Sequence, residues 1–281
     1  MIPKKIHYCW LSGEEFPEAV INTVNTWKEI MPDYELVLWD SKRFDVNSVA
    51  CVKDAYDSKR WAFAADYIRL YAVYTEGGIY LDSDVVVRKR FDDFLNYGFF
   101  SGIDCHYGTY TKAYSRVFKY RKPTNPIVPN SVWAGINAAI FGAEKGHPFV
   151  KDMLDWYLDN QNEIKPSRLD TQQDIFEYIA PEIYATIAEN YGFDRTKNKK
   201  QTLSENMVIF PSSVFGPDAA QLTENSYAVH CTNSDWKTQK RWYHNPIIRK
   251  IFGMKPIEKP IYDFFNAFLK FERFNFPKEK E

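Results

Sequence analysis

Two aspartates beside one strand-like run are the residues of this 281-residue chain best suited to chemistry. Asp82 and Asp84 follow the apolar run Ile79 to Leu81, with a single serine between them. Alternate residues of an extended chain face the same way, so the two carboxylates can converge on one point. Neighbouring carboxylates repel each other unless a cation or hydrogen-bond donors lie between them. Hard oxygen ligands of this kind suit Mn²⁺ or Mg²⁺, which would also bind the oxygens of a diphosphate.

A second charged pair precedes this motif in a segment that is otherwise apolar. Residues 60–76 have helical spacing and end at Gly77 and Gly78, a helix C-terminal signal. Asp66 and Arg69 lie within this helix, where a buried charge without a partner is costly. One interpretation is an internal ion pair between residues three apart. In the other, Arg69 contacts phosphate or sugar oxygens and Asp66 contacts sugar hydroxyls, in one cleft with the two later aspartates.

The elements around these residues alternate in a way that predicts an α/β sheet. A strand at 6–11, a helix at 17–30 and a strand at 34–39 are typical of a nucleotide-binding domain. The helix at 60–76 then leads into a strand at 79–87, which Asp82-Ser83-Asp84 interrupts. Further expected elements are strands at 137–141, 207–210 and 227–230, a helix at 148–158, and a polar helical region at 165–200.

Composition excludes some classes of function. Lys and Arg number 36 against 37 Asp and Glu, so there is no basic field that would favour nucleic acid as a partner. Aromatic residues reach 17% of the chain. They either fill the core or stack on sugar and base rings, and both interpretations stay open.

The cysteines and the hydropathy pattern point to the cytoplasm. Cys9, Cys51, Cys105 and Cys231 show neither zinc spacing nor a CxxC pair, which favours reduced thiols, buried at Cys9 and Cys231. No signal peptide is recognisable, and no run of about 18 apolar residues could span a bilayer. We therefore expect a cytoplasmic protein, with peripheral contact to the inner face of the membrane still open.

The charged motifs also resemble those of a known family. Residues 61–69 followed by 77–84 look like the DxD sugar-binding region of glycosyltransferase family 32, which contains yeast mannosyltransferases and bacterial capsule-synthesis enzymes. They are also similar to the catalytic domain of the large clostridial glucosylating toxins. Two further stretches resemble the family's first strand and its C-terminal ending, namely residues 2–10 and the set His230, Ser234 and Trp236.

The resemblance implies a fold and a reaction. The expected fold is GT-A, a Rossmann-like mixed sheet flanked by helices, over residues 1–244, with a C-terminal helical segment at 245–281. The expected reaction moves a hexose from a nucleotide-sugar donor, a UDP-sugar by preference, with retention of configuration and a divalent cation. A saccharide or lipid-linked acceptor in bacterial surface polysaccharide synthesis would receive the sugar.

Individual roles follow from the same resemblance. Trp10 would stack on the donor base beside the Cys9 backbone, Asp84 would bind the metal directly, and Asp82 would meet ribose and sugar hydroxyls. Asn137, after an expected turn at 133–135, is a further candidate for the sugar. The implied donor-binding set is Cys9, Trp10, Asp66, Arg69, Asp82, Asn137, Ser234 and Trp236, the implied metal ligands are Asp84, Asp82 and His230, and the implied catalytic set is Asp66, Arg69, Asp82 and Asp84.

Two other functions fit parts of the sequence. Asp82-Ser83-Asp84-Val85-Val86 matches the signature of haloacid-dehalogenase-like phosphohydrolases, whose first aspartate is a nucleophile and whose second is a general acid. The aromatic excess alone would suit a non-catalytic sugar-binding module. The aromatic and basic stretch at 246–275 is either an amphipathic helix packed on the domain or a membrane-surface contact.

Overall fold

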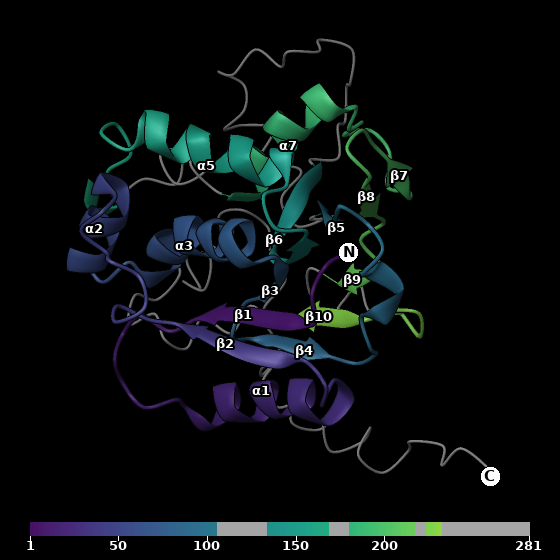
Figure 1. Ribbon diagram of the computed structural model, residues 1–281, viewed down its shortest axis with the longest axis horizontal. Coiled ribbons are helices and arrows are strands. Elements are labelled where there is room, and N and C mark those ends of the chain that lie inside the picture. Colours follow the sequence, from purple (N-terminus) through teal and green to yellow (C-terminus); the bar gives the residue numbers. More distant parts are fainter. Residues whose placement is uncertain (106–133, 169–179, 217–222, 232–281) are drawn as a thin grey trace, which may run out of the picture. The chain divides into compact units, whose positions relative to one another are not determined.

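The structure is a computed structural model that describes residues 1–105, 134–168, 180–216 and 223–231 (Figure 1). These residues belong to the first of two units of the chain, Met1–Asn233. Its elements are β1 (Lys5–Cys9), α1 (Glu18–Ile30), β2 (Glu35–Trp39), α2 (Ala50–Asp57), α3 (Trp61–Glu76), β3 (Gly78–Leu81), β4 (Val85–Val87), η1 (Asp92–Phe94), β5 (Phe99–Cys105), β6 (Ala134–Ala143), α5 (Pro148–Asn160), η3 (Pro166–Arg168), α7 (Ala180–Ala188), η4 (Glu189–Tyr191), β7 (Gln201–Thr202), β8 (Met207–Phe210), β9 (Phe215–Gly216) and β10 (Ala228–His230). The predicted domain boundary at 244 lies outside the described residues.

Two sheets organise this unit. The larger has seven strands in the order β2-β1-β3-β6-β5-β8-β7, and the smaller has three in the order β4-β10-β9. In the larger sheet β1 is parallel to β2 and β3, whereas β6 is antiparallel to β3 and β5. The expected mixed α/β sheet flanked by helices is therefore confirmed.

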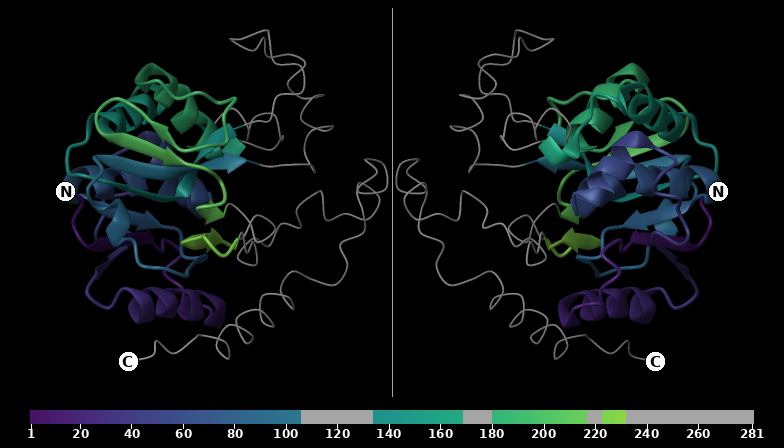
Figure 2. Two further views of the ribbon diagram at one scale, coloured as in Figure 1. Left: turned by 90° about the vertical axis from the view of Figure 1, so that its right-hand side faces the viewer. Right: turned by 90° about the vertical axis from the view of Figure 1, so that its left-hand side faces the viewer.

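Helices cover both faces of the larger sheet (Figures 1 and 2). On one face α1 packs through Val20, Val24 and Trp27 against Ile6 of β1 and Ile79 of β3. On the other face α2, α3, α5 and α7 share a core with the opposite side of the same strands. Strands buried on both faces require continuous apolar runs, which β3 and β8 have; β6 is buried throughout as well, with Asn137 as its one polar residue.

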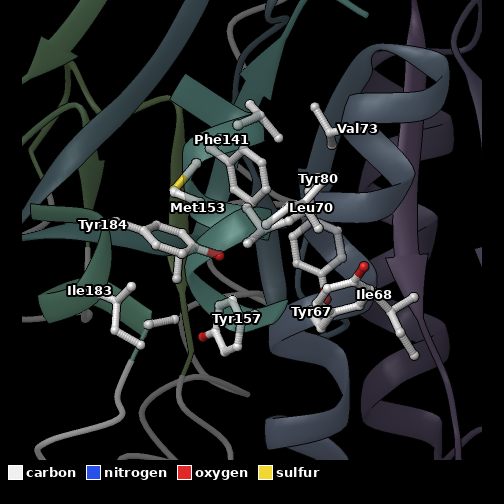
Figure 3. Close-up of a cluster of buried hydrophobic side chains, with 14 of the residues drawn as sticks. Tyr67, Ile68, Leu70, Val73, Tyr80, Phe141, Met153, Tyr157, Ile183 and Tyr184 are labelled. Atoms are coloured by element: carbon white, nitrogen blue, oxygen red, sulfur yellow. The ribbon is translucent and has the colours of Figure 1, made fainter. Parts of the chain in front are cut away.

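The helix α3 is the central helix of the second layer. Nine of its sixteen residues are buried, as predicted for a helix that is apolar on nearly all sides. Figure 3 shows Leu70 and Val73 of α3 in a cluster that brings together α3, β3, β6, α5 and α7. Tyr80, Phe141 and Tyr184 lie in the same cluster. Because the cluster surrounds α3, the helix and its two charges are fixed relative to the strand ends.

A double glycine joins α3 to β3. Gly77 has φ +68° and its N–H closes the helix on Val73 O at 2.8 Å, while Gly78 has φ +122°. A Cβ at Gly77 would lie 2.9 Å from the backbone nitrogen of Lys145, so a larger residue is excluded by contact as well as by conformation. The predicted helix end is confirmed, and it turns the chain directly into the strand before Asp82.

Several expected elements differ from those in the structure. Residues 79–87 are not one interrupted strand, because β3 joins the large sheet and β4 the small one. The expected turn at 133–135 is wrong for Ala134 and Gly135, which pair with β5 as the start of β6. The polar helical region at 165–200 is wrong in its polarity, since six of the nine residues of α7 are buried. The helix α2 and the strand β5 were not predicted.

Aromatic side chains fill much of the described core. The ring of Phe94 lies 5.0 Å from those of Phe100 and Phe215 and 4.7 Å from that of Tyr227, between centroids. Such edge-to-face and offset contacts add to the burial energy of each ring. Core packing therefore explains a large share of the aromatic excess in this part of the chain.

The cysteines of the described core are free thiols. Cys9, Cys51 and Cys231 are buried, in agreement with the expectation for Cys9 and Cys231. Burial raises the pKa of the Cys9 thiol to about 12. Among the helices of the described ranges, none combines the length and the apolar character needed to cross a bilayer.

A buried histidine links β1 to the double glycine. His7 is fully buried, its Nδ1 accepts from Trp39 Nε1 at 3.0 Å, and its Nε2 donates to Gly77 O at 2.8 Å. These two bonds require the neutral ring with its proton on Nε2. Burial lowers the pKa of His7 below its usual value.

We predict a pH-dependent loss of stability from His7. Below the unfolded pKa of about 6.5 the unfolded chain binds a proton that the folded chain excludes, so the free energy of unfolding falls with falling pH, by at most about 1.4 kcal/mol per pH unit. Urea unfolding of the wild type and of His7→Gln, measured from about pH 7 to about pH 5, would give a shallower slope in the variant. His147 has a lowered pKa as well and contributes equally to both slopes, so identical slopes would contradict the prediction.

Candidate metal centre and active site

The candidate site lies where two neighbouring parallel strands end. From β1 the chain passes through α1 to β2 on one side, and then through α2 and α3 to β3 on the other side of β1. Such a reversal of strand order is where open α/β sheets bind ligands, outside the carboxyl ends of the strands. Trp10 follows β1 and Asp82 follows β3 at this point.

Backbone hydrogen bonds then bring a distant histidine to the two aspartates. Asp82 donates its N–H to Ala139 O at 2.9 Å, and its own carbonyl accepts from Val85 N at 2.9 Å. The turn delivers the chain to β4, which pairs antiparallel with β10 so that His230 lies opposite Val85. Cys231 N donates to Asp84 O at 2.9 Å and continues this pairing.

The result is a cluster of three side chains that could hold a cation. His230 Nε2 lies 3.1 Å from Asp84 Oδ1 and 3.9 Å from Asp82 Oδ2. One ligand atom from each of the three residues lies within 4.8 Å of the others, and all three residues are partly exposed. Two carboxylate oxygens and one imidazole nitrogen fit Mn²⁺ well and Mg²⁺ less well, since Mg²⁺ prefers oxygen and water.

The two carboxylates of the cluster also favour the protonated form of His230. Burial alone lowers the pKa of His230, but the charges of Asp84 and Asp82 outweigh it and raise the pKa to about 9. A cation bound at Nε2 competes with that proton. The three residues thus form a site where either a proton or a metal balances the two carboxylates.

Arg69 is buried next to the cluster, and each of its guanidinium nitrogens contacts a protein oxygen. Its Nε donates to Ala65 O at 3.2 Å and its Nη1 to Ala138 O at 2.9 Å. Its Nη2 lies 3.1 Å from Asp66 Oδ1 and 3.3 Å from Asp82 Oδ1. Burial opposes this charge, yet the neighbouring Asp82 keeps the pKa of Arg69 well above its usual value.

This geometry combines the two interpretations of the Asp66 and Arg69 pair. The internal ion pair exists, but Arg69 also reaches Asp82, so the pair is not isolated in the core. Helix α3 and the strand end after β3 therefore contribute to one charged group. That these charges share a ligand-binding cleft stays a prediction.

The two oxygens of Asp82 have different surroundings. Oδ1 accepts from the Tyr80 hydroxyl at 2.8 Å and faces Arg69, whereas Oδ2 is the oxygen nearest His230. The ring of Tyr80 also lies 4.9 Å from the Arg69 guanidinium carbon. Tyr80 was not predicted as a site residue, although strand alternation places it on the same face as Asp82 and could have indicated it.

The other predicted donor-binding residues are placed as follows. Trp10 is partly exposed, with its Nε1 bonded to Glu14 O at 2.7 Å and its ring 5.1 Å from that of Phe16. Cys9 is buried at the end of β1, beside Trp39 of β2. Asn137 is buried, and its Oδ1 accepts from the N–H groups of Ala139 and Ile140 at 2.9 and 3.2 Å.

Asn137 therefore has one atom left for other contacts. Its Nδ2 is buried and has no hydrogen-bond partner within the described residues. If Asn137 contacts a donor, this amide is the group that does so. Ser234, Trp236 and the stretch 246–275 lie outside the described residues.

Comparison with known proteins gives a family match for part of the site. Residues 17–100 match the family described as glycosyltransferase sugar-binding region containing DXD motif. This range includes Asp66, Arg69, Asp82 and Asp84 but not Trp10, Asn137 or His230. The match thus covers the helix α3, the double glycine and the DxD turn.

Two curated relatives are similar over part of the chain. Inositol phosphoceramide mannosyltransferase 3 of Schizosaccharomyces pombe is 30% identical over 157 residues, which cover 54% of this chain and 36% of the relative. An uncharacterized glycosyltransferase of Acanthamoeba polyphaga mimivirus is 35% identical over 106 residues, covering 36% and 42% respectively. The chain thus spans less than half the length of either relative.

Solved structures give a weaker likeness. The structure titled PaToxG glycosyltransferase has a TM-score of 0.45 and 14% identity, and the overlap covers 67% of this chain and 69% of that one. The sequence match is the stronger finding, and it includes the charged residues predicted from the sequence. Residues 17–100 of this chain are thus similar to glycosyltransferase sugar-binding regions that contain the DXD motif.

Proposed function

We propose that the chain is a metal-dependent GT-A glycosyltransferase that moves a hexose from a nucleotide-sugar donor to a saccharide or lipid-linked acceptor. One observation carries this proposal. The Asp82, Asp84 and His230 cluster lies next to the buried Arg69 at the carboxyl ends of β1 and β3. A cation site and a fixed positive charge at this edge of the sheet suit a diphosphate leaving group.

The charges of the site support a cation as part of the enzyme. Asp66, Asp82 and Asp84 contribute three carboxylates, against one guanidinium from Arg69 and the imidazole of His230. Asp84 and His230 would hold the cation with Asp82 Oδ2, and the bound cation would act as a Lewis acid toward the departing diphosphate. Asp82 Oδ1, already bonded to Tyr80, would keep the carboxylate oriented.

Arg69 would act as a fixed charge in this scheme. Four of its neighbours are protein oxygens, so its guanidinium cannot follow a moving ligand. A preorganised charge stabilises developing negative charge without reorganisation at the moment of reaction. Asp66, in turn, would accept hydrogen bonds from donor sugar hydroxyls.

We also propose that the reaction retains configuration without a covalent enzyme intermediate. The carboxylates of the site are already engaged, since Asp66 and Asp82 pair with Arg69 and Asp84 lies against His230. Among the described cysteines, Cys9 and Cys231 lie at the ends of β1 and β10, and burial raises the pKa of each thiol to about 12. A protonated, buried thiol is a poor nucleophile. The acceptor hydroxyl would then attack from the face that the diphosphate leaves.

We also propose which nucleotide, cation and acceptor the enzyme uses. We favour UDP as the nucleotide on the toxin-like set Trp10, Asp66 and Arg69, with Mn²⁺ as the cation and bacterial surface polysaccharide as the product. The name of the fission yeast relative supports a hexose as the transferred sugar and an inositol-bearing phospholipid as one class of acceptor. The match of residues 17–100 to a region of glycosyltransferases favours this function over a phosphohydrolase and over a non-catalytic sugar-binding module.

Calorimetry with a panel of nucleotide sugars tests this function directly. UDP-glucose, UDP-galactose, UDP-N-acetylhexosamines and GDP-mannose would each be titrated with and without Mn²⁺. We expect one donor to bind only with the cation and to be hydrolysed slowly. Cleavage of phosphomonoesters would support the phosphohydrolase instead, and binding of free sugar without nucleotide would support the module.

Asp84→Asn should remove cation binding. The amide keeps the size of the side chain but loses the charge, and we expect Mn²⁺ affinity and donor cleavage to fall at least about 100-fold. Asp155→Asn is the matched control, because Asp155 is a more exposed carboxylate in an i,i+4 ion pair with Lys151. Unchanged cleavage and metal dependence in Asp84→Asn would be incompatible with the proposal.

Arg69→Lys should lower activity although it preserves the charge. A single ammonium cannot reach Ala65 O, Ala138 O and Asp82 together, so we expect kcat/KM for the donor to fall about 100-fold. Arg195→Lys is the control, since Arg195 also bonds three side chains, but these belong to α7 and η4 and not to the site. A role of Arg69 in the reaction would be supported if both variants lost similar amounts of melting temperature but only Arg69→Lys lost kcat/KM. Equal kcat/KM in the two variants would refute that role.

A further inference from the structure

The strand β6 is irregular at the place where it borders the site. Ile136 pairs with Ile103 of β5 and Phe141 pairs with Ser101. Four residues of β6, Asn137 to Ile140, therefore lie opposite the single residue Gly102. We call these four residues the β6 bulge. Bulges of this kind redirect backbone and side-chain groups next to active sites.

Two carbonyls of the β6 bulge bind the charged residues of the site. Ala138 O accepts from Arg69 Nη1 at 2.9 Å, and Ala139 O accepts from Asp82 N at 2.9 Å. The carbonyls of a regular strand point toward neighbouring strands in the plane of the sheet. Arg69 comes from α3, which packs on the face of that sheet, so a carbonyl can reach it only where the strand is distorted.

Side chains hold the remaining backbone groups of the β6 bulge. Asn137 Oδ1 accepts from Ala139 N and Ile140 N, which have no such partner on β5. The hydroxyl of Ser101 lies 2.8 Å from Asn137 O and 2.9 Å from Ile140 O, at the two ends of the bulge. Ser101 is fully buried, so water cannot replace it at these carbonyls.

We infer that Ser101 is a positioning residue for the proposed donor and cation site, acting through the β6 bulge on Arg69 and Asp82. Its single hydroxyl proton is shared between the carbonyls at the two ends of the bulge. The two carbonyls between those ends set the position of the guanidinium and of the DxD turn. The role in catalysis rests on the proposed function. The control of the Asp82 backbone by Ser101 does not, and it can be measured separately.

The test compares Ser101→Ala with a matched loss of a buried hydroxyl. Ser226 is also fully buried, and its hydroxyl donates to Ser213 O at 2.6 Å and accepts from Thr223 N at 2.9 Å, away from the β6 bulge. Both Ser→Ala variants should lose a few degrees of melting temperature, since each leaves a buried carbonyl unpaired. Ser101→Cys keeps a weak donor of similar size and serves where Ser101→Ala does not fold.

Amide hydrogen exchange gives the readout that needs neither donor nor metal. We expect faster exchange at the peptide that contains Asp82 in Ser101→Ala and Ser101→Cys, with no change there in Ser226→Ala. Unchanged exchange at Asp82 in a folded Ser101 variant would overturn the inference, whatever the protein's activity. A merely structural serine would lower the melting temperature without this local effect.

Binding and kinetics complete the test. With the wild type shown to bind Mn²⁺ and a donor, Ser101→Ala should weaken Mn²⁺ affinity and kcat/KM by about tenfold or more, and Ser226→Ala should leave both unchanged. Equal binding in both variants would overturn the catalytic part of the inference. If the wild type bound neither Mn²⁺ nor a donor, the proposed function would fail, and the exchange result would still decide whether Ser101 positions Asp82.

Discussion

The architecture of the site depends on one buried charge. The guanidinium of Arg69 lies in the core, where an unpaired charge would be strongly destabilising. Its partners come from its own helix, from the end of β3 and from the β6 bulge. Satisfying this single group therefore fixes three separate elements relative to one another. The aromatic cluster around α3 and the double glycine at its end supply the rigidity that this requires.

The part of the site that α3, the double glycine and the DxD turn form could largely be predicted from the sequence. The helix at α3, its end at Gly77 and the strand before Asp82 follow from local signals, namely apolar spacing and glycine. The α/β sheet followed from the alternation of strands and helices, and its mixed strand directions from the resemblance. The charged residues of α3 and the DxD turn stood out because charges are rare in apolar segments. These features are encoded within about 30 residues of each other, as local patterns must be.

The part of the site that β10 and the β6 bulge contribute depends on contacts between distant segments, which no local sequence pattern shows. The pairing of β4 with β10 places His230 beside Asp84, and only the resemblance pointed to that histidine. The β6 bulge was invisible because Ala138 and Ala139 act through backbone carbonyls, which carry no residue-type signal. The expected turn before Asn137 was wrong because the start of β6 is set by its pairing with β5, which the local sequence does not show.

The pairing of β4 with β10 determines when a newly synthesised chain can assemble its cation site. Asp82 and Asp84 lie in the first third of the chain, whereas His230 lies near the end of the described residues and is synthesised much later. Until β10 arrives, the two carboxylates have no imidazole beside them, and a growing chain holds only part of its cation-binding set. Contacts between distant segments form late and slowly. The complete cation-binding set therefore exists only in a chain whose β10 has paired with β4 in the second sheet.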